Sequence, residues 1–141
     1  MRIRIFAIFK KTIYISALEP FLLSNGIETV ATCSNTELAI EQYKRLKADL
    51  VLMDVNWNDC NYSVSGDSVI RQLKEVNPKV RIIGFTSFFE PLVLEKLKSE
   101  GVQGYFYKSM DDTLEQIKQC IIHVQGGQTY YATTEIKSLP V

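Results

Sequence analysis

The sequence lacks several features that would reveal a function directly. Its 16 lysines and arginines balance its 16 aspartates and glutamates, so it does not carry the basic charge expected of a dedicated nucleic-acid-binding protein. The three cysteines are widely spaced and no pair has zinc-ligand spacing, which favours a reducing compartment. The opening stretch MRIRIFAIFKK is too short, and too interrupted by Arg4, for a signal peptide or a membrane helix. We therefore expect a cytoplasmic protein without a membrane segment.

What the sequence does contain is an alternation of two patterns. Hydrophobic residues make up 46% of the 141 residues, enough to build the core of one domain. Short apolar runs rich in β-branched and aromatic residues predict strands, and segments with helical spacing of apolar residues lie between them. The predicted strands are 3–9, 27–33, 49–54, 80–85 and 104–107, and the predicted helices are 12–25, 35–47, 66–77, 91–100 and 111–125.

This alternating order predicts an α/β fold with a doubly wound parallel sheet and helices on both faces. The strands are almost continuously apolar, as expected of strands that are covered on both sides. We expect one domain over residues 1–127, and a polar tail over 128–141 that starts a linker.

Two of the predicted helices contain residues that bear on where the helix begins. Pro20 lies inside the first helical segment, so this segment is either a short helix capped by Ser16 and Glu19 or one longer, kinked helix. Ser34 and Glu37 have the spacing of a capping box and predict the start of the second helix.

Three polar residues follow three of the predicted strands. Asp54 ends the third strand, Thr86 follows the fourth and Lys108 follows the fifth. Ligands of doubly wound sheets bind at the carboxyl ends of the strands, so these side chains should lie at one edge. A carboxylate, a hydroxyl and an ammonium group are the parts needed to hold a phosphoryl group on an aspartate. The carboxylate would be the nucleophile, and the other two groups would donate to the phosphoryl oxygens.

With these motifs the chain resembles the response-regulator receiver domain over residues 3–127. The stretches that carry the resemblance are VLMDV, GFTS and GVQGYFYKS. The resemblance implies a flavodoxin-like (βα)5 fold with strand order 2-1-3-4-5, a phosphoacceptor at Asp54, a switch hydroxyl at Thr86, a switch aromatic at Tyr105 and a phosphoryl-binding lysine at Lys108.

The resemblance also implies partners. Receiver domains are controlled by histidine kinases or other signalling proteins, and we expect a homodimer. The ending GYFYKSMDDTLEQIKQCIIHVQGGQTYYA resembles the branch with a C-terminal helix-turn-helix DNA-binding domain. DNA would then be contacted only through a domain absent from this sequence.

The end of the first strand departs from the family. Receivers have a pair of acids there that bind Mg²⁺, whereas FAIFKKT places Phe9 and Lys10 in those positions, and no acid lies between Met1 and Leu18. Mg²⁺ requires a near-octahedral shell of oxygen ligands. We therefore expect no cofactor, and an ion pair of Asp54 with Lys10, Lys108 or both.

A second departure is the polar loop NWNDCNYSVSGD, over residues 56–67. Its length and polarity predict that residues 56–66 are mobile. Asn56, Asp59 and Asp67 are weak candidates for substitute metal ligands beside Asp54.

Three interpretations follow. The favoured one is a degenerate, non-enzymatic receiver that regulates an output domain through protein contacts. The second is a working phosphoacceptor whose loop acids recruit Mg²⁺. The third, a small flavodoxin-like enzyme or nucleotide binder, is disfavoured because FKKT stands where a glycine-rich phosphate loop would follow the first strand.

Overall fold

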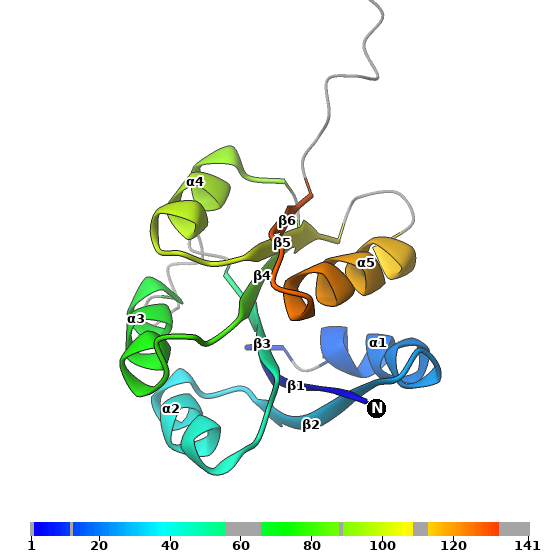
Figure 1. The fold of residues 1–141 in the computed structure, drawn as a ribbon, viewed down its shortest axis with the longest axis horizontal. Coiled ribbons are helices and arrows are strands. Elements are labelled where there is room, and N and C mark those ends of the chain that lie inside the picture. The colour runs from blue at the N-terminus through cyan, green and yellow to red at the C-terminus, as the bar shows by residue number, and fades with distance from the viewer. Residues whose placement is uncertain (1, 12, 56–65, 88, 109–112, 133–141) are drawn as a thin grey trace, which may run out of the picture.

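The computed structural model describes residues 2–11, 13–55, 66–87, 89–108 and 113–132. These residues form one parallel sheet in the order β2-β1-β3-β4-β5-β6. Helices α1 and α5 cover one face of the sheet, and α2, α3 and α4 cover the other (Figure 1). The strands are β1 (Ile3–Ile8), β2 (Ile27–Cys33), β3 (Leu50–Asp54), β4 (Ile82–Thr86), β5 (Gly104–Tyr107) and β6 (Tyr130–Tyr131). The helices are α1 (Ile13–Ser24), α2 (Thr36–Arg45), α3 (Gly66–Val76), α4 (Pro91–Ser99) and α5 (Thr113–Gln125).

This arrangement confirms the predicted doubly wound, flavodoxin-like fold and the order 2-1-3-4-5 of the first five strands. Every residue of β3, β4 and β5 is buried, which explains why these strands are almost purely apolar. The strand β1 lies between β2 and β3 and is buried from Ile5 onward.

The first helix is one continuous element, Ile13–Ser24, with Pro20 inside it. Of the two alternatives that Pro20 left open, the longer helix is therefore the correct one. Pro20 is exposed, so the backbone group that proline leaves without its helical hydrogen bond lies on the water side.

The predicted cap of the second helix was wrong by one residue. Helix α2 begins at Thr36, and its N-cap is Asn35, whose side-chain Oδ1 accepts a hydrogen bond of 2.8 Å from the amide of Glu37. Asparagine and serine are equally good caps. The sequence Ser34-Asn35 therefore offers two candidates, and the pattern of Ser34 with Glu37 selected the wrong one.

The sheet also contains a sixth strand that the sequence did not predict. The amide of Tyr130 donates to the carbonyl of Gln103 at 2.9 Å, and the amide of Ala132 donates to the carbonyl of Tyr105 at 2.8 Å. Residues 130–132 of the expected tail therefore pair with β5. Residues 133–141 lie outside the described part of the chain, so the predicted domain boundary stays a prediction.

Two further expectations concern the mobility of a loop and the absence of a membrane-spanning helix. Residues 56–66 were predicted to be mobile; residues 56–65 lie outside the described residues, and Gly66 is the first residue of α3. Within the described ranges, none of the helices combines the length and apolar character required to cross a membrane.

Candidate functional site

The carboxyl ends of β3, β4 and β5 bring the predicted site residues to one edge of the sheet. Asp54 is the last residue of β3 and pairs in register with Phe85, and Thr86 is the last residue of β4. The amide of Lys108 donates to the carbonyl of Thr86 at 2.9 Å. Asp54, Thr86 and Lys108 therefore stand at the ends of three adjacent strands, as the sequence predicted.

Asp54 and Thr86 are the buried polar side chains of the described residues, with exposed fractions of 7% and 0%. The main-chain amide of Lys10 donates to Oδ2 of Asp54 across 3.4 Å, which is long for a hydrogen bond. The contact places the backbone of Lys10, the second residue after β1, beside the carboxylate. A burial of this degree normally requires hydrogen bonds or a charge partner for the acid.

Tyr105 connects this edge to the next element. Its hydroxyl and the hydroxyl of Thr86 share a hydrogen bond of 2.8 Å, and the amide of Glu90, just before α4, donates to the Tyr105 oxygen at 3.1 Å. The ring is fully buried, and this burial raises the pKa of the Tyr105 hydroxyl above its ordinary value. The sequence analysis identified both Thr86 and Tyr105 as candidate switch residues, but their spacing along the chain did not predict the hydrogen bond between their side chains.

Lys108 is exposed, and its Nζ lies 4.7 Å from the centre of the Tyr14 ring, on α1. An ammonium group over an aromatic face is attracted by the ring quadrupole. The predicted ion pair of Asp54 with Lys10 or Lys108 stays a prediction.

An aromatic cluster occupies the space behind the end of β1. Phe9 is 1% exposed, and its ring centre lies 5.5 Å from that of Phe85. Phe85 in turn lies 4.8 Å from Phe106 and 6.0 Å from Tyr14, between ring centres. Sequence reasoning named Phe9 only as a missing acid and did not find this cluster. The available signal was an aromatic residue near the end of each of β1, β4 and β5.

The described residues at this edge of the sheet do not supply a magnesium site by themselves. Of the two positions at the end of β1, Phe9 offers no ligand atom and Lys10 brings an ammonium group. Across the described residues there is no group of three His, Cys, Asp or Glu side chains placed to hold a metal ion. Asn56 and Asp59 lie outside the described residues, and Asp67 is described only through its backbone in α3. An oxygen-rich Mg²⁺ shell would need donors beyond those that the described strand ends supply.

Comparison with known families agrees with this geometry. The family model of the response regulator receiver domain matches residues 10–121. The chain belongs to the receiver-domain family. Receiver domains are signalling domains of two-component response regulators.

A curated relative gives the extent of the similarity. This receiver domain is 29% identical over 105 residues to the transcriptional regulatory protein LnrK of Bacillus subtilis (strain 168). The match covers 74% of this chain and 45% of LnrK. The chain therefore spans about half the length of this relative.

Solved structures show the same fold at lower identity. A two-component response regulator of the LuxR family from Aurantimonas sp. SI85-9A1 superposes with a TM-score of 0.83 and 21% identity, covering 98% of this chain and 94% of that one. The beryllofluoride-activated NtrC4 receiver domain dimer superposes with a TM-score of 0.74 and 19% identity, covering 88% and 97%. At these identities the likeness is one of fold.

Proposed function

We propose that this receiver domain is degenerate and regulates its output through protein contacts, without Mg²⁺-dependent phosphoryl transfer to Asp54. The observation that carries the proposal is the identity of the residues at the end of β1. Phe9 is packed into an aromatic cluster, and the amide of Lys10 lies 3.4 Å from the Asp54 carboxylate.

Charge supports this reading. In receivers that bind Mg²⁺, acids at this strand end supply oxygen ligands. Here, the side chain of Lys10 leaves the backbone right beside Asp54, and Lys108 follows β5 at the same edge. Each ammonium group repels a divalent cation and attracts a neighbouring carboxylate. A lysine is therefore the expected counterion of Asp54.

The output surface would be the one formed by α4, β5 and α5. Three large apolar side chains on its helices are exposed, namely Leu92 on α4 (86%) and Leu114 and Ile122 on α5 (44% and 45%). Exposed large apolar side chains on a surface are candidates for protein contacts. We infer that this surface pairs with a second copy or with another signalling protein such as a histidine kinase; the NtrC4 receiver domain, which has the same fold, forms a dimer.

The wider role follows from the relatives. LnrK is a transcriptional regulatory protein about twice as long as the matched region. By analogy, this domain would regulate transcription in the cytoplasm, and DNA would be contacted by a C-terminal domain beyond this sequence.

Phosphoryl transfer can be tested directly. The protein is incubated with acetyl phosphate and Mg²⁺, and its intact mass is recorded. We expect no phosphoryl adduct in the unmodified protein. The double variant Phe9→Asp/Lys10→Asp should gain one, because it restores two oxygen ligands at the end of β1. Lys11→Asp repeats the lysine-to-aspartate exchange one residue later, serves as the control and should gain none.

The working phosphoacceptor is the second candidate, favoured by the placement of Asp54, Thr86 and Lys108 on adjacent strand ends. It predicts an adduct in the unmodified protein that disappears in Asp54→Asn and weakens in Asp59→Asn or Asp67→Asn. That result would replace the degenerate reading.

A further inference from the structure

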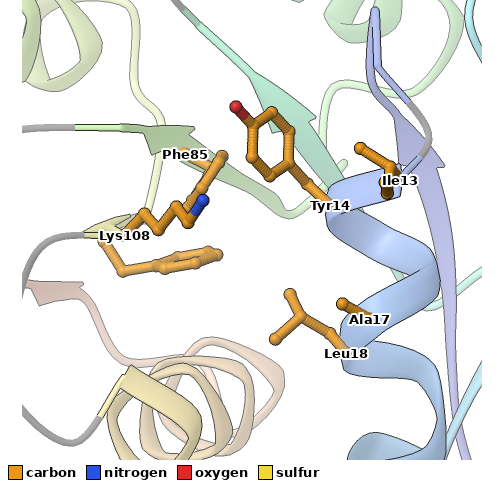
Figure 2. A pocket seen from close by; sticks show the side chains of 7 residues that line it. Ile13, Tyr14, Ala17, Leu18, Phe85 and Lys108 are labelled. Carbon is orange, nitrogen blue, oxygen red and sulfur yellow. The ribbon is translucent and has the colours of Figure 1, made fainter.

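A pocket of about 400 Å³ opens between α1 and the sheet, next to the strand ends. Figure 2 shows Tyr14, Ala17 and Leu18 on α1 facing Phe85 and Lys108 across the opening. Phe106, on β5, completes the wall on the sheet side. Pockets that hold small organic molecules have volumes of roughly 300–1,000 Å³, so this one has the size of a small ligand site.

The lining combines aromatic surface with one cation. Phe85 and Phe106 contact each other with ring centres 4.8 Å apart, and the Tyr14 ring lies 6.0 Å from Phe85. Of the described residues that line the pocket, Lys108 alone is charged. Its ammonium group already lies over the Tyr14 ring, 4.7 Å from the ring centre. The pocket therefore offers flat apolar walls together with a positive charge held close to them.

We propose that this pocket binds a small aromatic anion, a ring system that carries a carboxylate or a sulfonate. The ring would lie against Ile13, Ala17 and Leu18 of α1 and remove their exposed apolar surface from water. Phe85 and Phe106 line the pocket on the sheet side but are only 3% and 0% exposed. The acidic group would pair with the ammonium group of Lys108. An apolar pocket with a few convergent polar groups is the usual form of a small-molecule site.

The chemistry favours this ligand over the alternatives. A cation would be repelled by Lys108, and a neutral ring would leave that charge without a partner on the ligand. The exposed residue Ile13, 71% exposed on the first turn of α1, also lines the pocket and adds apolar surface near its rim.

A ligand here would also act on the candidate site. Lys108 follows β5 at the edge that carries Asp54 and Thr86, and its amide is bonded to the carbonyl of Thr86. A bound anion would hold the ammonium group of Lys108 on the α1 side. This receiver domain would then have a chemical input other than phosphoryl transfer. Binding itself requires neither Mg²⁺ nor a phosphodonor, so it is independent of the proposed function.

Two matched fluorescent probes test the proposal. The first is 8-anilino-1-naphthalenesulfonate, a fused aromatic anion. The second is N-phenyl-1-naphthylamine, the same ring system without the sulfonate. We expect the anionic probe to bind saturably, with one probe per chain, and more tightly than the neutral one. Thermal unfolding of every variant is monitored by circular dichroism. A cooperative transition shows that the variant is folded and that the probe signal comes from folded protein.

Ala17→Phe tests the location, because Ala17 is an exposed lining residue and a ring there fills the pocket. The variant should lower the affinity for both probes about tenfold or more, because the added ring occupies the volume that a probe would fill. The control is Ser16→Phe, which adds the same ring to an exposed neighbour in α1 outside the pocket lining and should leave both affinities unchanged.

Lys108→Met tests the charge. It should weaken the anionic probe about three- to fivefold, the value of an exposed ion pair, and leave the neutral probe unaffected. Lys98→Met is the matched control, because Lys98 also lies over a tyrosine ring, 5.2 Å from the centre of Tyr131. The proposal is overturned if the anionic probe does not saturate, if Ala17→Phe and Ser16→Phe act alike, or if Lys108→Met and Lys98→Met do.

Discussion

The hydroxyl groups of Tyr105 and Thr86 lie 2.8 Å apart and share a buried hydrogen bond. The same tyrosine oxygen accepts a hydrogen bond from the amide of Glu90, the residue that precedes α4. One buried ring therefore links the end of β4 to the start of α4. Thr86 is thereby connected, through Tyr105, to the backbone just before the helix on which Leu92 is exposed.

Replacing Tyr105 by phenylalanine removes both hydrogen bonds and keeps the ring. We expect Tyr105→Phe to lower the free energy of unfolding by about 1–3 kcal/mol, because each of the two buried neutral hydrogen bonds contributes about 0.5–1.5 kcal/mol. Urea denaturation followed by circular dichroism measures this. The double-mutant cycle with Thr86→Val should give a coupling energy of about 0.5–2 kcal/mol. Strictly additive effects would mean that the two hydroxyls do not stabilise each other.

Alkaline pH should destabilise the fold through two buried groups. Burial raises the pKa of the Tyr105 hydroxyl above 10.0 and that of the Cys120 thiol above 9.0. The unfolded chain has the ordinary values, so as pH rises from about 9 it loses these protons before the folded chain does. The free energy of unfolding is therefore highest below about pH 9 and falls as pH rises through the folded pKa values. Urea titrations at increasing pH should show a flatter decline in Cys120→Ala and in Tyr105→Phe; curves parallel to that of the unmodified protein would contradict this.

The cap of α2 gives a prediction with a control next to it. Asn35→Ala removes the hydrogen bond from the amide of Glu37 and should lower the free energy of unfolding by about 1 kcal/mol. Ser34→Ala should have little effect, because Ser34 is exposed and is not the N-cap. Chemical denaturation of the two variants side by side decides between them. A larger loss of stability in Ser34→Ala than in Asn35→Ala would instead support the capping box of Ser34 and Glu37 that the sequence predicted.

Self-association should depend on the exposed leucine of α4. Leu92 is 86% exposed, and Leu92→Arg would place a charge in the proposed contact surface. We expect a homodimer in sedimentation velocity and a shift to monomer in this variant. Leu38→Arg, at a leucine of α2 that is 54% exposed, is the control and should leave the dimer intact. A protein that stays monomeric at high concentration, or a dimer indifferent to Leu92→Arg, would argue against this surface.

The sequence predicted the sheet well because the strands have a strong local signal. Ile82–Thr86 and Leu50–Asp54 are buried on both faces. Strands of this kind need apolar residues at successive positions, so they are visible as continuous apolar runs in the sequence. The strand Tyr130–Tyr131 carries no such signal, since it is two residues long and depends on pairing with β5. Short edge pairings of this kind are set by tertiary contacts.

The candidate site was predictable only in part. Asp54, Thr86 and Lys108 could be placed because the ends of parallel strands meet at one edge. The bond between Thr86 and Tyr105, and the contact of Lys108 with the ring of Tyr14, depend on side-chain rotamers and on the packing of α1. No spacing along the chain encodes these. Phe9 was recognised as a departure, but its neighbour Phe85 became visible only when β1 and β4 were placed around β3.

A titration with Mg²⁺ tests the central claim most directly. Trp57 is the single tryptophan and lies three residues beyond Asp54 in the sequence, so its fluorescence is a suitable reporter, with isothermal titration calorimetry as an independent measure. We expect neither signal to respond to millimolar Mg²⁺ in the unmodified protein, because Lys10 stands where an acid would supply an oxygen ligand. Lys10→Asp should create a saturable response, and Lys11→Asp should not. Saturable binding by the unmodified protein that is abolished in Asp54→Asn would contradict the account and make this domain a conventional phosphoacceptor.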